Sequence, residues 1–99
     1  MRIWLDDIRP APAGYIHHTD PEVVIELLLT GQVTAISFDH DLGEDMLSGY
    51  DVAKVIEQLA FEACITRVEW QIHSANPVGR KNIEAAMRNA DKYWQRNKA

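Results

Sequence analysis

Short apolar runs alternate along the chain with longer segments in which apolar residues recur at helical spacing. Runs at residues 2–5, 34–38 and 67–72 predict β-strands, and a weaker run at 15–18 predicts a further short strand. The segments between and after these runs predict three helices, which begin near residues 21, 50 and 77. Strands that alternate with helices indicate right-handed βαβ units, so we expect a parallel sheet with helices on both faces.

Capping residues mark where the predicted helices begin. Thr19 is expected to cap the first helix in a capping box closed by Glu22, and Ser48 is expected to cap the second. Asn76 precedes Pro77, a residue suited to the first helical position, so Asn76 is the expected cap of the third helix. The sequence therefore predicts one three-layer α/β domain over residues 1–99.

Composition places the chain among globular proteins. Of its 99 residues, 46% are hydrophobic and 25% are charged, which excludes wholesale disorder. The longest apolar run, residues 23–29, is interrupted by Glu26, so we expect no membrane span and no membrane partner. The single cysteine, Cys64, excludes an internal disulfide framework and a cysteine-based zinc site. These features predict a cytoplasmic domain.

Charge is distributed unevenly along the chain, whose formal net charge is −5. Residues 1–78 contain 13 acidic and 4 basic residues, whereas residues 79–99 contain 2 acidic and 6 basic residues. The basic last helix has two interpretations, a solvated face beside an acidic body or a surface that meets a polyanion.

Polar side chains follow three of the predicted strands at the point where each strand ends. These segments are Asp6-Asp7, Asp39-His40-Asp41 and His73-Ser74. In open α/β sheets the ligand site lies outside the carboxyl ends of the strands. We therefore expect the functional site at this edge of the sheet.

The acidic residues at this edge predict a metal site. Asp6, Asp7, Asp39 and Asp41 all lie at strand ends, and two carboxylates about 4 Å apart repel by roughly 4 kcal/mol at an effective dielectric near 20. A hard divalent cation such as Mg²⁺ or Mn²⁺ relieves that repulsion and accepts oxygen ligands. The alternative is that individual aspartates cap loops and point into water.

The segment at residues 73–80 predicts a phosphate site. The free N–H groups at the start of the third helix attract anions, and Gly79 allows a ligand to approach the backbone. Ser74 and Asn76 offer polar side chains, and Arg80 offers a forked donor suited to phosphate oxygens. Ordinary helix capping is the alternative interpretation of Asn76 and Pro77.

Two histidines at strand ends are candidate proton-transfer groups. His40 and His73 lie where a general acid or base is expected, and either can also serve as a hydrogen-bonded spacer.

The segments at residues 3–7 and 36–43 resemble the receiver domains of two-component response regulators. The resemblance implies a receiver- or flavodoxin-like fold with four parallel strands in the order 2-1-3-4. In this comparison Asp39 corresponds to the phosphoacceptor, Asp6 and Asp7 to the metal-binding pair, and Ser74 to the hydroxyl residue after the fourth strand. The first helix is replaced by the turn at residues 9–14, and the fifth strand and the lysine that follows it are lacking.

Three short motifs are similar to a smaller receiver-like group, the cyclic-phosphate processing receiver family. They are Leu-Asp-Asp-x-Arg-Pro at residues 5–10, Asp-His-Asp-Leu-Gly at 39–43 and His-Ser-x-Asn-Pro-x-Gly at 73–79. The resemblance covers nearly the whole chain and implies processing of a cyclic phosphate.

The leading hypothesis is a metal-dependent phosphoesterase that hydrolyses a cyclic phosphate on a small molecule or a nucleic-acid end. Asp6, Asp7 and Asp39 then hold Mg²⁺ or Mn²⁺. Asp39 is counted among the catalytic residues as a metal ligand, Asp41 or His40 is expected to handle the proton, and His73 is the candidate acid for the leaving alkoxide. The residues expected to bind phosphate are Ser74, Asn76, Gly79 and Arg80. Two alternatives stay open. One is a non-catalytic signalling module that is phosphorylated on Asp39 or binds a nucleotide, and the other is a phosphoaspartate-type phosphatase.

Overall fold

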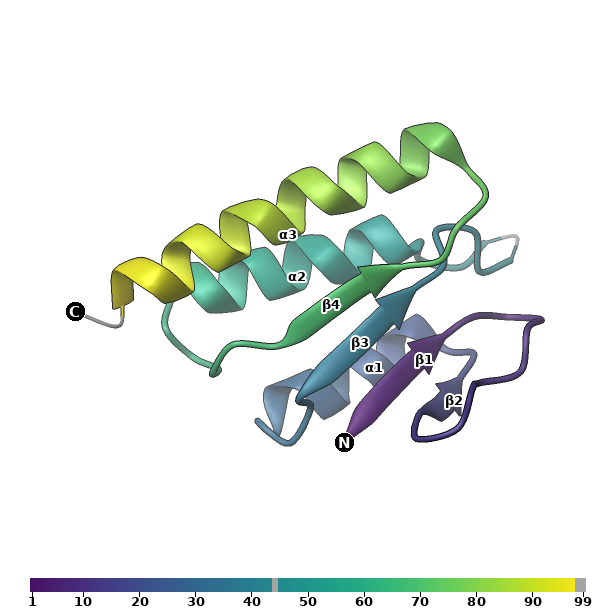
Figure 1. Cartoon of the computed structure of the whole chain (residues 1–99), viewed down its shortest axis with the longest axis horizontal. Helices are drawn as coiled ribbons and strands as arrows, with labels where there is room; N and C mark the ends of the chain where they lie inside the picture. Colours follow the sequence, from purple (N-terminus) through teal and green to yellow (C-terminus); the bar gives the residue numbers. More distant parts are fainter. Residues whose placement is uncertain (44, 98–99) are drawn as a thin grey trace.

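The computed structural model describes residues 1–43 and 45–97, and strands and helices alternate along them (Figure 1). The elements are β1 (Arg2–Leu5), β2 (Ile16–His18), α1 (Pro21–Leu29), β3 (Ala35–Phe38), α2 (Gly49–Phe61), β4 (Glu69–Ile72) and α3 (Pro77–Asn97). None of the helices in the described residues combines the length and apolar character needed to cross a bilayer.

The four strands form one parallel sheet in the order β2-β1-β3-β4, as expected. Ile3 pairs with Ile36 and Leu5 with Phe38, so the apolar side chains of neighbouring strands share one face. After β4 the described chain continues as α3, and no fifth strand forms among these residues. The predicted receiver-like α/β fold and strand order are confirmed.

All three helices pack on the same face of the sheet. Their apolar side chains form one buried cluster with those of β1 and β3, and Trp70 of β4 donates a hydrogen bond to Asp91 of α3 (Figure 1). The crossovers β2–α1–β3 and β3–α2–β4 run in the same direction across the sheet. Right-handed crossovers that run in the same direction place their helices on the same face of the sheet. The expected helix layer on the second face is therefore wrong for the described residues: the segment after β1, which contains Pro10 and Pro12, forms a turn there instead.

The second face is covered near the site by two stacked rings. Trp4 of β1 and His73, which follows β4, lie with ring centroids 3.7 Å apart and planes 3° from parallel. Trp4 also donates from Nε1 to the carbonyl of Arg9, which fastens the turn after β1 against this face. The ring pair and the turn occupy the place of a helix layer at this end of the sheet.

Helix capping follows the sequence in two places and differs in one. Ser48 caps α2 in a reciprocal capping box with Asp51, and Asn76 accepts a hydrogen bond from the Gly79 N–H at the start of α3. The cap of α1 is Asp20, whose carboxylate accepts from the Glu22 N–H, so the prediction of Thr19 is wrong by one residue. Pro21 at the first helical position sets this start.

Candidate functional site

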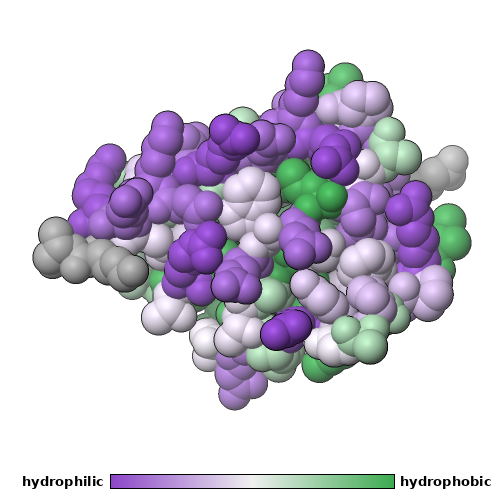
Figure 2. Space-filling model, in the orientation of Figure 1, coloured by the Kyte–Doolittle hydropathy of each residue, from purple (hydrophilic) through white to green (hydrophobic). Residues whose placement is uncertain are grey.

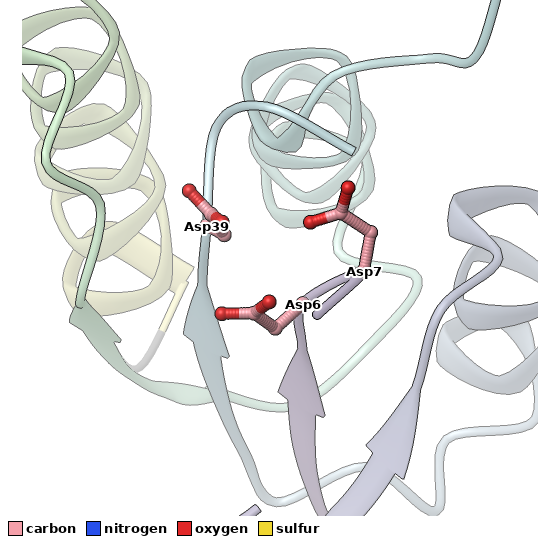
Figure 3. A group of neighbouring side chains, drawn as sticks. All are labelled: Asp6, Asp7 and Asp39. Atoms are coloured by element: carbon pink, nitrogen blue, oxygen red, sulfur yellow. The ribbon is translucent and has the colours of Figure 1, made fainter. Parts of the chain in front are cut away.

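Three carboxylates meet at the carboxyl end of the two central strands (Figure 3). Asp6 and Asp7 follow β1, Asp39 follows β3, and one oxygen from each lies within 4.8 Å of the other two. The Asp39 N–H donates to the Leu5 carbonyl at 2.9 Å, so the strand pairing itself holds the two segments side by side. The sheet thus brings Asp39 to Asp6 and Asp7, which lie 33 and 32 positions earlier in the sequence.

Asp6 is a buried carboxylate with a hydrogen bond on each oxygen. Its Oδ1 accepts from the N–H groups of Ile8 and Arg9, both at 2.8 Å, and its Oδ2 accepts from His73 Nε2 at 3.0 Å. Burial alone raises the pKa of Asp6, but these hydrogen bonds outweigh it and hold the pKa below the ordinary value. Asp6 is therefore ionised and fixed in orientation.

His73 is fixed through both of its ring nitrogens. Because a carboxylate only accepts, Nε2 carries the proton that bonds Asp6, and burial lowers the pKa of His73 and keeps the ring neutral. Nδ1 then accepts from the hydroxyl of Ser37, at 2.8 Å. The chain Ser37–His73–Asp6 and the stacking on Trp4 orient the buried carboxylate.

Sequence reasoning missed Ser37 and Trp4 as supports of the site. Ser37 is the one hydroxyl residue in an otherwise apolar strand, and it is buried. Strand alternation places Ser37 and its pairing partner Trp4 on the face away from the helices, beside His73. A buried polar residue within an apolar strand is the signal that could have identified this support.

His40 and Asp41 form a polar pair beside the carboxylates. His40 Nδ1 and Asp41 Oδ1 are 3.0 Å apart, and this hydrogen bond lowers the pKa of Asp41. The His40 N–H donates to Asp39 Oδ1 at 2.8 Å, which ties the pair to the acidic cluster. Within residues 1–43 and 45–97, His40 Nε2 makes no hydrogen bond, in contrast to both nitrogens of His73.

Two glycines allow the site loops to pack closely. A Cβ on Gly49 would lie 2.0 Å from the Asp39 carbonyl oxygen, and a Cβ on Gly79 would lie 2.4 Å from Cγ of His40. Gly79 was expected to admit a ligand to the backbone, but in the structure the His40 ring occupies that space. The start of α3 therefore packs directly against the Asp39–Asp41 loop.

The predicted phosphate-binding residues lie at the start of α3. Asn76 bonds Asp41 through its side-chain amide at 3.4 Å, which joins this segment to the acidic loop. The buried Ser74 hydroxyl accepts from the Asn76 N–H. Arg80 donates to the carbonyls of Ile72 and Ser74, so its guanidinium fastens the loop after β4.

The donor set of the acidic cluster fits a hard divalent cation. Asp6, Asp7 and Asp39 offer three carboxylates on rigid strand ends, and carboxylate oxygens are the ligands that Mg²⁺ and Mn²⁺ prefer. Asp7 and Asp39 are partly exposed, which leaves access from solvent.

A parallel α/β sheet with an acidic pair after its first strand and an aspartate after the third defines a receiver-like domain with a candidate cation site. A family model described as the cyclic-phosphate processing receiver domain matches residues 1–89. The chain belongs to this family, which links it to cyclic-phosphate processing. Comparisons with curated proteins and with solved structures give no significant match.

Proposed function

We propose that this domain is a divalent-metal-dependent hydrolase of cyclic phosphates, including those at nucleotide or RNA ends. The observation that carries the proposal is the meeting of Asp6, Asp7 and Asp39 at one point beside the His40–Asp41 pair. Such a site combines an electrophilic centre with a proton-transfer group, which are the two requirements of phosphoester hydrolysis.

Asp6, Asp7 and Asp39 hold the cation in this proposal. When bound, Mg²⁺ or Mn²⁺ supplies charge stabilisation at the phosphoryl oxygens and lowers the pKa of a bound water. The exposed side of the cluster accepts the cyclic phosphate, while the hydrogen bonds to the buried Asp6 prevent it from turning away. Ser74, Asn76 and Arg80 remain the candidates for the neighbouring phosphate-binding edge, whereas the His40 ring covers Gly79.

Proton transfer is assigned to His40 with Asp41. Opening a cyclic phosphate by water forms a phosphorus–oxygen bond to the water oxygen, which loses a proton, and breaks one ester bond, so that the leaving alkoxide takes up a proton. His40 Nε2, which has no hydrogen-bond partner among the described residues, is suited to exchange these protons, and Asp41 orients the ring through Nδ1. Both nitrogens of His73 are already bonded, so its geometry favours a positioning role over the proton transfer expected from the sequence.

The test is an assay with several phosphate substrates. The protein is incubated with Mg²⁺ or Mn²⁺ and with a 2′,3′-cyclic mononucleotide, cyclic dinucleotides or RNA with a cyclic end, and products are separated by chromatography. We expect turnover that chelator abolishes, that Asp39→Ala abolishes, and that the exposed control Asp45→Asn preserves.

Other outcomes of this assay favour the alternatives. Tight nucleotide binding without product indicates a non-catalytic sensor. Acid-labile labelling of Asp39 by acetyl phosphate indicates a phosphorylated receiver, and rapid loss of that label with turnover of phosphomonoesters indicates a phosphoaspartate-type phosphatase.

A further inference from the structure

The outward face of α3 carries a strip of cations. Lys81, Arg88, Lys92 and Arg96 are exposed and are spaced by seven, four and four residues, which places them on one side of the helix. The opposite side carries the buried residues Ile83, Met87, Ala90 and Trp94. Hydrophilic side chains cover the α3 edge of the molecule in Figure 2. We call these four cations the basic strip.

The acidic residues of α3 lie to one side of the basic strip. Asp91 accepts from Arg67 Nε at 3.1 Å and from Trp70 Nε1 at 3.0 Å, so it faces β4. Glu84 pairs with Arg88 at 2.6 Å on the same flank. The strip therefore keeps a net positive charge, although the preceding 78 residues contain 13 acidic and only 4 basic residues.

An aromatic pair lies at the far end of the basic strip. Phe61 at the end of α2 is 57% exposed, and its ring meets the Tyr93 ring edge-on with centroids 5.2 Å apart. The Arg96 guanidinium lies 5.5 Å from the Tyr93 ring centroid. Tyr93 is half-buried, so Phe61 is the exposed ring of the pair. Cations beside an exposed aromatic ring are features with which proteins bind single-stranded nucleic acid, because a base stacks on the ring.

The basic strip begins at the candidate active site. Asn76, which caps α3, bonds Asp41, and Lys81 lies little more than one helical turn beyond it. From Pro77 to Tyr93 the helix rises by about 24 Å, which suits a site of several nucleotides. A strand lying along α3 therefore reaches from the aromatic pair to the acidic cluster.

We propose that the basic strip binds a single-stranded polynucleotide and presents its cyclic phosphate end to Asp6, Asp7 and Asp39. The claim about the strand end rests on the proposed function, whereas the claim about binding does not. The exposed Phe61 ring, on which a base can stack, favours a nucleic acid over an acidic peptide or an anionic membrane, which offer no bases.

Fluorescence anisotropy with a ten-nucleotide single-stranded RNA tests the binding claim. For about four phosphate contacts we expect a log–log salt slope near −3, or roughly 50-fold weaker binding between about 50 and 200 mM salt. A variant with Lys81→Gln, Arg88→Gln and Lys92→Gln is expected to retain its fold and to reduce the slope to about −1. Two single variants form a matched pair. Lys92→Gln is expected to weaken RNA binding, whereas Arg2→Gln, which removes an exposed cation from β1, is expected to leave it unchanged.

Three outcomes overturn this inference: equal RNA affinity of the wild type and the triple variant, equal competition by polyglutamate or anionic vesicles, or no effect of Phe61→Ala. Turnover of a cyclic mononucleotide separates this inference from the proposed function. If that turnover occurs without RNA binding, the binding claim for the basic strip is wrong and the proposed hydrolase function is supported. RNA binding that depends on the strip but is accompanied by no turnover supports the strip and contradicts the hydrolase.

Discussion

Replacing Asp39 by Asn tests whether repulsion among the carboxylates of Asp6, Asp7 and Asp39 lowers the stability of the metal-free protein. One oxygen from each of three carboxylates lies within 4.8 Å of the others, so Asp39→Asn removes two repulsive pairs. At that separation a pair repels by about 1 kcal/mol in water and by roughly 3–4 kcal/mol at an effective dielectric of 20. Because Asp7 and Asp39 are partly exposed, the lower value applies, and we expect a gain of about 2 kcal/mol without metal. The Asn side-chain oxygen can still accept from the His40 N–H.

The assay is differential scanning calorimetry of both proteins with chelator and with saturating Mg²⁺. A gain of about 2 kcal/mol raises the midpoint of a domain this small by roughly 10 °C in chelator. Mg²⁺ is then expected to stabilise the wild type and to have little effect on Asp39→Asn, since the variant lacks one of three anionic ligands.

Asp45→Asn is the matched control, because Asp45 is exposed and its φ of 60° is one that Asn tolerates. Its midpoint is expected to change little in either buffer. A lower midpoint of Asp39→Asn in chelator, combined with equal stabilisation of both proteins by Mg²⁺, would refute the electrostatic reasoning.

Three other substitutions test the supports of the site and the packing of the helices. Gly49→Ala places a Cβ 2.0 Å from the Asp39 carbonyl, so we expect about 3 kcal/mol less stability in urea unfolding. His73→Ala removes the ring that orients Asp6, and Mn²⁺ affinity measured by calorimetry is expected to fall about 10- to 100-fold. Burial raises the pKa of Glu57, but hydrogen bonds from Lys54 and Asn89 outweigh it and hold the pKa below its ordinary value. The stability that ionised Glu57 contributes near neutral pH is therefore lost in acid. In the wild type, the free energy of unfolding measured in urea is expected to fall between about pH 5 and 3. Glu57→Gln is expected to make that fall smaller by about 0.5–1 kcal/mol.

For each of these substitutions, one result would contradict the expectation. Gly31→Ala, with φ of 76° and no heavy atom within 4 Å of its Cβ, measures the backbone strain alone, expected at about 1 kcal/mol. An equal loss in Gly49→Ala would show that the Asp39 carbonyl does not limit the packing. Unchanged Mn²⁺ affinity of His73→Ala, or an unchanged acid profile of Glu57→Gln, would contradict the role assigned to that side chain.

The sequence patterns predicted the elements, and the family resemblance implied the strand order, but neither showed how the second face of the sheet is covered. Apolar runs and caps such as Ser48 are local signals, and β1 was predicted at its observed bounds. The placement of all helices on one face follows from the direction of successive crossovers, and the turn containing Pro10 and Pro12 cannot supply a further helix. The cap of α1 was misplaced because Thr19 and Asp20 are both good capping residues.

At the site, the sequence located the residues at strand ends better than it assigned their contacts. The parallel sheet brings Asp6, Asp7 and Asp39 together because their strands are neighbours. The sequence could not show that Gly79 packs on His40, because that contact joins the first turn of α3 to the loop after β3, far apart in sequence. The bonding of both His73 nitrogens likewise depends on distances that only the folded chain provides.

The proposed function requires that Asp6, Asp7 and Asp39 together bind one divalent cation. Anomalous diffraction from a crystal soaked in Mn²⁺ measures this directly. We expect an anomalous peak within coordination distance of a carboxylate oxygen of each of the three aspartates, and its loss in Asp39→Asn crystals. A featureless map at this end of the sheet, or a Mn²⁺ ion bound only by other residues, would contradict it.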